Sequence, residues 1–362
     1  MEKKGYLLLE DGSLYEGTLR GAQKDATAEL VFTTAMVGYM EALTDPSYDG
    51  QIVVQTFPCI GNYGVIPFEE EPPRPRMAGY VVRELCDAPN NFRCTGKLDD
   101  YLREAGITCL TGVDTRALTR KLRDHGVMSA AILTLKPADM DAALAALRAH
   151  SYHPDIQNTT CTEVIQPRTK GLYHVVLWDF GAKANIQQEL EKRGCAVTCV
   201  PANTTCSEIM ALAPDGVVLS NGAGDPRDNA GIISEVQELC RQNLPVFGIG
   251  LGHQILALCQ GGSVVKLQYG HRGANQPVKD VKTALNYITS QNHGFAVDGE
   301  HLPENATVRF INCNDSTCEG LDYTDLLAYS VQFHPEACGG PLDTRFLFDR
   351  FIAMMGGNKE CR

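Results

Sequence analysis

The sequence has no excess of positive charge and no long apolar run, and each absence excludes a class of protein. Its 362 residues carry 44 Asp and Glu against 32 Lys and Arg, a formal net charge of −12 at pH 7. This balance argues against nonspecific binding to nucleic acid or to an anionic membrane. No apolar stretch approaches the length that spans a bilayer. The apolar run Tyr6 to Leu9 is too short for a secretion signal, so we expect a cytoplasmic protein.

The chain also lacks cysteine and histidine at metal-binding spacings. None of the 14 cysteines belongs to a C-x-x-C pair, so a zinc ribbon or a redox motif is not expected. The nine histidines form no H-x-x-x-H pair and no cluster with cysteine, so the sequence predicts no metal site. We expect most cysteines to be reduced, small core residues.

What is present divides the chain near its middle. Residues 1–150 predict a mixed α/β domain, with a hairpin, one further strand and two helices, at 6–19, 28–32, 117–124 and 139–150. Residues 151–172 are rich in Pro, Thr, Asn and Gln and predict a linker or a long surface segment. Residues 173–362 form the second domain.

Strands and helices alternate regularly at the start of the second domain. The predicted strands are 174–180, 196–200, 216–220 and 245–249, and the predicted helices are 183–192, 207–212, 230–241 and 253–260. This alternation is typical of an α/β fold with a largely parallel sheet covered by helices. Ligands bind beyond the carboxyl ends of such strands. We therefore expect the loops at 179–181, 220–226 and 250 to converge on one edge of the sheet.

The turn at 250 predicts a strand–elbow–helix unit of the kind that holds a nucleophile. Gly248 and Gly252 allow the strand and the helix to approach closely. The central residue is Gly250, which has no side chain to attack with. Elbow nucleophiles occupy strained backbone conformations, and glycine accepts a positive φ without that strain. We predict that Gly250 keeps the elbow and leaves a small void.

Two further motifs carry polar groups. His334 precedes Glu336 by two residues, a spacing that suits a general base and the group that orients it. Residues 292–295 predict a turn that offers backbone donors. Singly each motif is weak, since a lone histidine is more often structural than catalytic. Their order and spacing within one domain give them weight.

Together the motifs resemble those of class I, triad-type glutamine amidotransferases. They read Ser-Asn-Gly-x-Gly-Asp-Pro, Gly-Ile-x-Leu-Gly-His-Gln, Gln-Asn-His-Gly-Phe and His-Pro-Glu, at 220–226, 248–254, 291–295 and 334–336. The first domain resembles the small subunit of carbamoyl-phosphate synthetase through Thr-Asp-Pro-Ser-Tyr, Gly-Asn-Tyr-Gly and Gly-Val-Asp-Thr-Arg-Ala-Leu-Thr, at 44–48, 61–64 and 112–119. Asp-Phe-Gly-Ala-Lys at 179–183 resembles the same subunit. The resemblance covers nearly the whole chain.

The resemblance implies a role for each motif. An elbow cysteine would attack the glutamine side-chain amide, with His334 as the general base and Glu336 as its orienting partner. Backbone N–H groups of Leu251 and of Gly222 or Gly224 would form the oxyanion hole. The residues implied to hold glutamine are Ser47, Gly222, Gly224, Leu251, Gln254, Asn292, Gly294 and Phe295. The role of Ser47 requires the two domains to face each other.

The chain departs from the family pattern at two positions. Ala223 stands where the family has proline, and Gly250 stands where it has the nucleophilic cysteine. Losing the nucleophile of such a unit costs about six orders of magnitude in rate, so we expect this chain to be deficient in glutamine hydrolysis. Cys259 and Cys338 are poor substitutes. Cys259 lies near the far end of the helix, and Cys338 is not on the elbow.

The resemblance also implies partners and leaves alternatives open. A large subunit would form a heterodimer with this chain and use ATP and magnesium, while this chain would need no cofactor and no metal. The product, carbamoyl phosphate, serves arginine or pyrimidine biosynthesis, and the sequence does not choose between them. A noncatalytic, glutamine-responsive regulatory subunit is the alternative. A nucleotide-binding protein fits poorly, because Arg227 occupies the third glycine position of a dinucleotide loop.

Overall fold

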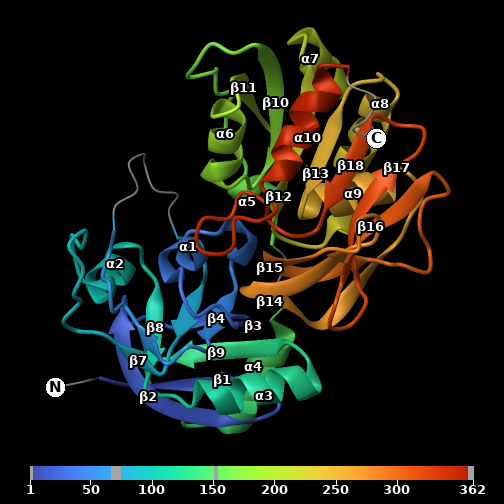
Figure 1. The fold of residues 1–362 in the computed structure, drawn as a ribbon. Coiled ribbons are helices and arrows are strands. Elements are labelled where there is room, and N and C mark those ends of the chain that lie inside the picture. The colour runs from blue at the N-terminus through green and yellow to red at the C-terminus, as the bar shows by residue number, and fades with distance from the viewer. Residues whose placement is uncertain (1–2, 67–74, 151–153, 358–362) are drawn as a thin grey trace. The chain divides into compact units, whose positions relative to one another are not determined.

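The computed structural model describes residues 3–66, 75–150 and 154–357. The chain divides into two units, Met1–His153 and Pro154–Arg362. Figure 1 shows the course of the chain through both units. None of the helices in the described ranges is long and apolar enough to cross a membrane.

The described part of the first unit is built on a closed barrel in the order β1-β2-β8-β6-β4-β3-β9. The barrel strands are β1 (Lys4–Leu9), β2 (Leu14–Gly21), β3 (Ala26–Thr33), β4 (Ile52–Gln55), β6 (Gly79–Val81), β8 (Thr108–Thr111) and β9 (Met128–Leu133). Strands β5 (Cys59–Ile60) and β7 (Glu84–Leu85) form a separate two-stranded sheet. The helices of this unit are α1 (Tyr39–Leu43), α2 (Leu98–Glu104), α3 (Thr115–His125) and α4 (Met140–Ala149), with a 3₁₀ turn η1 (Pro46–Tyr48).

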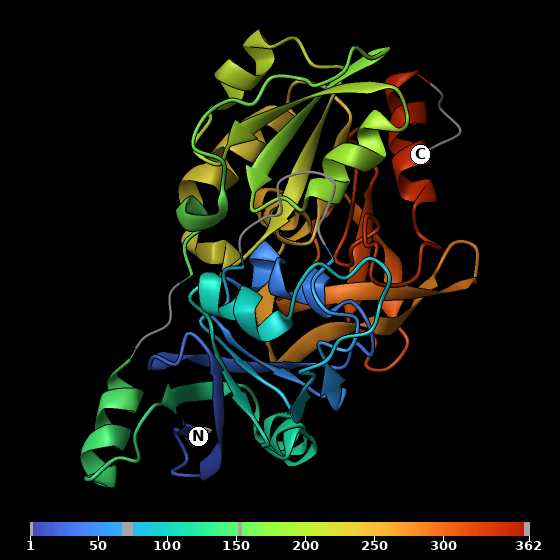
Figure 2. The ribbon, with the colours of Figure 1, turned by 90° about the vertical axis from the view of Figure 1, so that its left-hand side faces the viewer.

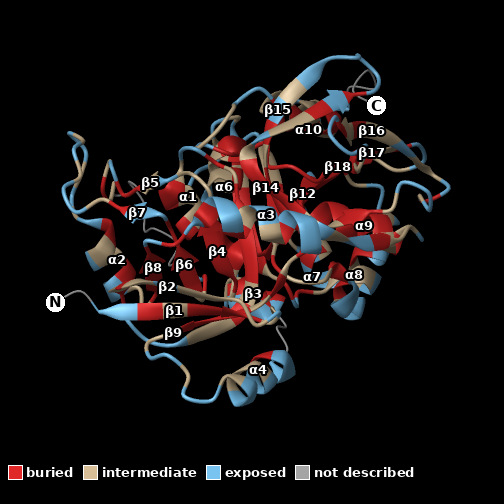
Figure 3. Cartoon of the chain, turned by 90° about the horizontal axis from the view of Figure 1, so that it is seen from below, coloured by how far each residue is buried: buried red, intermediate tan, exposed pale blue. Residues whose placement is uncertain are grey.

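Local signals account for the elements predicted in this unit. β1 and β2 pair antiparallel with Leu8 opposite Leu14, which confirms the predicted hairpin. The Asp114 and Asp139 carboxylates cap α3 and α4 by accepting from the backbone N–H of Ala117 (2.9 Å) and Ala142 (3.0 Å). Figure 3 shows the strands largely buried, whereas α4 exposes most of its surface.

The described part of the second unit forms a nine-stranded sheet in the order β11-β10-β12-β13-β18-β17-β15-β14-β16. Its strands are β10 (Tyr173–Phe180), β11 (Cys195–Pro201), β12 (Gly216–Gly222), β13 (Val246–Ile249), β14 (Val264–Asp280), β15 (Asn286–Val297), β16 (Ala306–Asn312), β17 (Cys318–Tyr323) and β18 (Ala328–Val331). Its helices are α5 (Ile156–Thr159), α6 (Ala184–Glu191), α7 (Cys206–Ala211), α8 (Ala230–Cys240), α9 (Leu251–Cys259) and α10 (Phe346–Met355), with a 3₁₀ turn η2 (Pro226–Asp228).

Helices cover both faces of the parallel half of this sheet (Figure 1, Figure 2). Pairing of β10 with β11 and β12, of β12 with β13 and of β13 with β18 is parallel, as the alternation predicts. One core packs α7, α8 and α9 against the sheet, and a second packs α6 and α10 on its other face. The result is the predicted α/β fold.

The other half of the sheet was not predicted strand by strand. β14, β15, β16 and β17 pair antiparallel. The prediction of a turn at 292–295 is wrong, because these residues lie inside strand β15. Residues of one short motif cannot reveal this, since the strand is defined by its pairing with β14, whose partner residues such as Arg272 lie outside the motif.

The segment predicted as a linker, 151–172, also contributes to the second unit. Its first three residues lie outside the described ranges. Ile156 of α5 is buried in the core, and the Thr159 hydroxyl donates to the Phe180 carbonyl (3.0 Å). Ile165 pairs with Cys199 of β11. Polar composition concealed these contacts, which depend on single apolar residues.

Candidate active site

The turn between β13 and α9 is an elbow with glycine at its apex. Gly250 has φ 57° and ψ −110°, a conformation that glycine adopts far more readily than a residue with a Cβ. Its N–H donates to the Val331 carbonyl (2.9 Å), and its own carbonyl accepts from the N–H groups of His253 (3.1 Å) and Gln254 (3.3 Å). The prediction that Gly250 keeps the elbow at positive φ is confirmed.

Gly252 allows α9 to lie directly on strand β12. A Cβ at this position would come 2.3 Å from the Leu219 carbonyl oxygen, which is a clash with backbone. A Cβ on Gly248 would lie 2.8 Å from the carbonyl oxygen of Gly252. The predicted close approach of strand and helix is therefore confirmed, and it depends on both glycines.

The missing side chain of the elbow would point toward a histidine. A Cβ built on Gly250 lies 3.2 Å from Asn221 Cβ and 3.7 Å from His334 Cε1. A thiol attached to that Cβ would therefore lie within reach of the His334 ring. The structure thus places the predicted nucleophile position beside the predicted base.

His334 and Glu336 follow β18 and are paired with each other. His334 Nδ1 lies 2.9 Å from Glu336 Oε1, and both side chains are buried. Burial by itself would raise the pKa of Glu336, but the charge and hydrogen bond of His334, together with Lys183, hold that pKa below its ordinary value. Glu336 is therefore a carboxylate that holds the imidazole through Nδ1 and leaves Nε2 for another partner.

Three of the predicted glutamine-binding residues, Asn292, Gly294 and Phe295, lie on β15. The Gln254 side-chain amide on α9 donates to the Phe295 carbonyl (2.8 Å) and to Gln332 Oε1 (2.9 Å). The side chain of Gln254 is buried. Helix α9, which follows the elbow, is thus hydrogen-bonded to β15, the strand that carries these three residues.

The loops after β10, β12 and β13 meet as predicted. The Phe180 N–H donates to the Ser220 hydroxyl (2.8 Å), and the Lys183 N–H donates to Asn221 Oδ1 (3.2 Å). A Cβ on Gly222 would lie 2.7 Å from a Leu251 methyl carbon. Adjacent parallel strands bring their carboxyl ends to one edge, so residues far apart in sequence become neighbours.

Gly224 and Ser47 complete the predicted set. Gly224 follows β12 with φ 99°. Ser47 belongs to the first unit, on η1, where its N–H donates to Asp45 Oδ1 (2.9 Å). Their binding roles stay predictions.

The two cysteines that could substitute for an elbow thiol lie elsewhere. Cys259 is buried at the far end of α9, and its Sγ donates to the Leu256 carbonyl (3.2 Å). Cys338 is exposed and lies beyond His334 in the chain. Of these three positions, 250 is therefore the one at which a cysteine would place its thiol beside His334.

His253, in the first turn of α9, is buried in neutral form. Its Nδ1 lies 2.7 Å from the Ser330 hydroxyl, and its Nε2 has no hydrogen-bond partner among the described residues. Burial lowers the pKa of His253 to about 3. The unfolded chain therefore binds a proton between pH 6.5 and 3 that the folded chain does not, so stability falls as the pH falls.

We predict that this one group removes about 2–3 kcal/mol of unfolding free energy between pH 6.5 and 4.5. Urea unfolding at the two pH values, on the chain and on His253→Gln, measures it. The variant should lose less stability on acidification by about that amount, whatever its stability at pH 6.5. Equal losses in the two proteins would contradict the assignment.

Polar residues without a predicted role also come together in the second unit. His271, His293 and Glu319 form one group, and Cys161, Asp179 and Cys199 form another. The members of each group are separated by about 20 residues or more along the chain. No spacing rule applied to the sequence finds them, and the expectation that histidines and cysteines do not cluster holds only along the chain.

Comparison with known proteins decides the family. A model described as the carbamoyl-phosphate synthase small chain, CPSase domain, matches residues 7–132. A glutamine amidotransferase class-I model matches residues 176–354. The carbamoyl phosphate synthase small chain of Symbiobacterium thermophilum is 47% identical over 354 residues, covering 96% of this chain and 97% of that protein. This chain belongs to the carbamoyl phosphate synthase small chain family.

Other members of the family are nearly as similar. The carbamoyl phosphate synthase small chain of Syntrophotalea carbinolica is 44% identical over 376 residues, covering 99% of each chain. That of Methanopyrus kandleri is 46% identical over 354 residues, covering 96% of this chain and 98% of that protein. Full-length coverage means that both units of the chain, and not the amidotransferase unit alone, match the family.

Proposed function

We propose that this chain is the glutamine-binding subunit of a carbamoyl phosphate synthase and that it binds glutamine without hydrolysing it. One observation carries the proposal. A Cβ on the elbow residue Gly250 would lie 3.7 Å from Cε1 of His334, which is held by the buried carboxylate of Glu336. The base and its orienting group stand beside a position that has no nucleophile.

The proposed pocket follows the residues around this point. Leu251 and Gln254 would hold the substrate from α9, and Asn292, Gly294 and Phe295 would hold it from β15. Gly222 at the end of β12 and Gly224 just after it would complete this part of the pocket. Backbone N–H groups of Leu251 and of Gly222 or Gly224 would stabilise the oxyanion of the tetrahedral intermediate. Peptide donors do this whatever their side chains.

The proposed defect lies in one side chain. With a cysteine at position 250, His334 would take the thiol proton and the thiolate would attack the amide carbon to form a tetrahedral intermediate. His334 would then return the proton to the nitrogen, so that the C–N bond breaks, ammonia leaves and a thioester remains. Water would then release glutamate. With Gly250 the first step has no attacking atom, and the residues that bind glutamine are unaffected.

The proposed partner is the large subunit of the synthase. It would use ATP with magnesium, bicarbonate and ammonia to make carbamoyl phosphate, for arginine or pyrimidine synthesis. In this arrangement the present chain needs no cofactor. A second role, as a glutamine-responsive subunit that regulates its partner, is favoured by the same retained pocket.

The test is synthesis by the purified complex of this chain with its large subunit. We expect carbamoyl phosphate from ammonium but none above background from glutamine, and calorimetric binding of glutamine to the chain. Glutamine-dependent synthesis would contradict the proposed defect, and failure to form a complex would contradict the proposed subunit role. A change in ammonium-dependent synthesis on adding glutamine would establish the regulatory role as well.

A further inference from the structure

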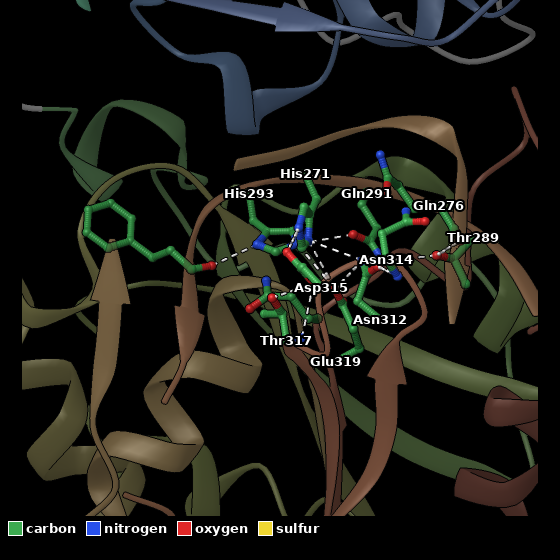
Figure 4. Close-up of polar contacts among 12 residues, drawn as sticks. His271, Gln276, Thr289, Gln291, His293, Asn312, Asn314, Asp315, Thr317 and Glu319 are labelled. Carbon is green, nitrogen blue, oxygen red and sulfur yellow. Dashed lines mark hydrogen bonds and ion pairs between the residues drawn. The ribbon is translucent and has the colours of Figure 1, made fainter. Parts of the chain in front are cut away.

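Three strands of the second unit bring two imidazoles and a carboxylate into one buried group (Figure 4). His271 lies on β14, His293 on β15 and Glu319 on β17. All three side chains are buried, Glu319 completely. One nitrogen or oxygen atom of each lies within 4.8 Å of the corresponding atoms of the other two. We call these residues the His₂Glu cluster.

The outer nitrogen of each imidazole already has an acceptor. His271 Nε2 lies 2.8 Å from Asp315 Oδ2, and His293 Nδ1 lies 2.7 Å from the Phe295 carbonyl oxygen. Metal-binding histidines usually donate their second N–H to a carboxylate or a backbone carbonyl in this way. Such donation fixes the tautomer, so that the lone pairs of His271 Nδ1 and His293 Nε2 face the cluster.

The centre of the cluster then has more acceptors than donors. His293 Nε2 faces Gln291 Oε1 at 3.2 Å and Glu319 Oε1 at 4.0 Å. Glu319 Oε2 has no hydrogen-bond partner among the described residues. Turning the Gln291 amide does not remove the conflict, because its oxygen would then face the Thr289 hydroxyl, which already donates to the Gln276 carbonyl.

A proton alone satisfies only part of this arrangement. On His271 Nδ1 it would bridge the 3.1 Å contact with Glu319 Oε1, to which the Asn312 amide also donates (3.0 Å). It would leave His293 Nε2 facing Gln291 Oε1 with no proton between them, and Glu319 Oε2 with no donor among the described residues. A cation at the centre would serve all of these atoms at once.

We propose that His271, His293 and Glu319 bind a divalent transition-metal cation of the Zn²⁺ class, with the Gln291 amide oxygen as fourth donor. Two imidazoles and a carboxylate are an established zinc ligand set. Tetrahedral zinc with bonds of about 2.1 Å needs ligand atoms about 3.4 Å apart. Three of the separations lie close to this requirement: His271 Nδ1 to Glu319 Oε1 (3.1 Å), His293 Nε2 to Gln291 Oε1 (3.2 Å) and His293 Nε2 to Glu319 Oε1 (4.0 Å). The ligand atoms of His271 and His293 lie within 4.8 Å of each other, so they must move closer when the cation binds.

The proposed site is structural. Four protein donors and complete burial of Glu319 leave no position for substrate. The cation would tie together β14, β15 and β17, and β15 also carries Phe295. Because the site lies in the interior, the metal would be acquired during folding or local opening of the turn that carries Asp315. The inference does not depend on glutamine chemistry at the elbow.

The test is a cobalt titration of the full chain after removal of metals by a chelator under mildly denaturing conditions and refolding. We expect one equivalent of Co²⁺ to bind with visible d–d bands and without the near-ultraviolet band of cobalt–thiolate bonds. Zn²⁺ should displace it. Asp315→Asn, at a partly exposed side chain, should weaken Co²⁺ binding about 10–100-fold by removing the outer acceptor of His271.

Two further variants complete the design. The double variant His271→Asn with Glu319→Gln should abolish the d–d bands. His301→Gln, which removes an exposed histidine paired with Asp298, should leave them unchanged. No d–d bands in the refolded parent chain, bands that Asp315→Asn does not weaken, or a thiolate band would each overturn the proposal. The thiolate band would indicate the cysteine pair Cys161 and Cys199 instead.

Discussion

Gly250→Cys is expected to raise glutamine hydrolysis by several orders of magnitude, up to about 10⁶-fold. The new Cβ would lie 3.7 Å from His334 Cε1, so the thiol would meet the base that Glu336 already orients. Ammonia release from glutamine by the purified chain, with and without its large subunit, measures the gain. Recovery of glutamine hydrolysis requires that the rest of the site be intact, as the proposed function assumes.

The same substitution should make the protein less stable. A residue with a Cβ at φ 57° and ψ −110° carries strain of about 1–3 kcal/mol. The Cβ would also lie 3.2 Å from Asn221 Cβ, so Asn221 must shift slightly. Gly250→Ala is the matched control, because it should lose similar stability in urea unfolding and gain no hydrolysis. Hydrolysis by Gly250→Ala, or none by Gly250→Cys, would contradict the assignment of position 250.

His334→Asn in the Gly250→Cys background should abolish most of the recovered activity. Removing the base of a nucleophile–base unit costs about as much as removing the nucleophile, roughly 10⁶-fold in kcat. The His334 ring is the group beside the new thiol, and its Nδ1 is held by Glu336 at 2.9 Å. Single-turnover hydrolysis measures the loss, and calorimetric glutamine affinity should remain within a few fold.

Glu336→Gln distinguishes orientation from proton transfer in the same background. The amide can accept or donate at Nδ1 but carries no charge, so hydrolysis should fall by less than in His334→Asn. Ala substitution at exposed Cys338 should change nothing. If His334→Asn retains hydrolysis within about tenfold, another group supplies the base, and the triad assignment for this chain is wrong.

Local sequence signals predicted the parallel half of the second unit well. The alternation of apolar strands with helices predicted β10, β11, β12 and β13 as strands of a largely parallel sheet, and the parallel registers of these strands confirm it. The helices predicted at 117–124 and 139–150 of the first unit were found in the same way and correspond to α3 and α4. These elements are determined by short-range patterns, namely apolar periodicity, capping side chains and glycine at a turn.

Elements that depend on long-range pairing were not predictable. Residues 292–295 have a turn-like composition, yet they lie within β15 because β14 supplies the partner hydrogen bonds. Ile156 lies in a polar stretch, yet its single side chain reaches the core. In both cases the deciding contact lies outside the short stretch from which the prediction was made.

The sequence by itself determined the family, the order of the motifs and the absence of a side chain at position 250. The tertiary structure decided which residues surround the position of the missing side chain. A Cβ at position 250 would lie 3.7 Å from His334 Cε1, although His334 is 84 positions away in the sequence, because β13 and β18 are neighbours. The His₂Glu cluster likewise exists only in the fold, because an antiparallel sheet brings β14, β15 and β17 together without leaving a regular spacing in the sequence.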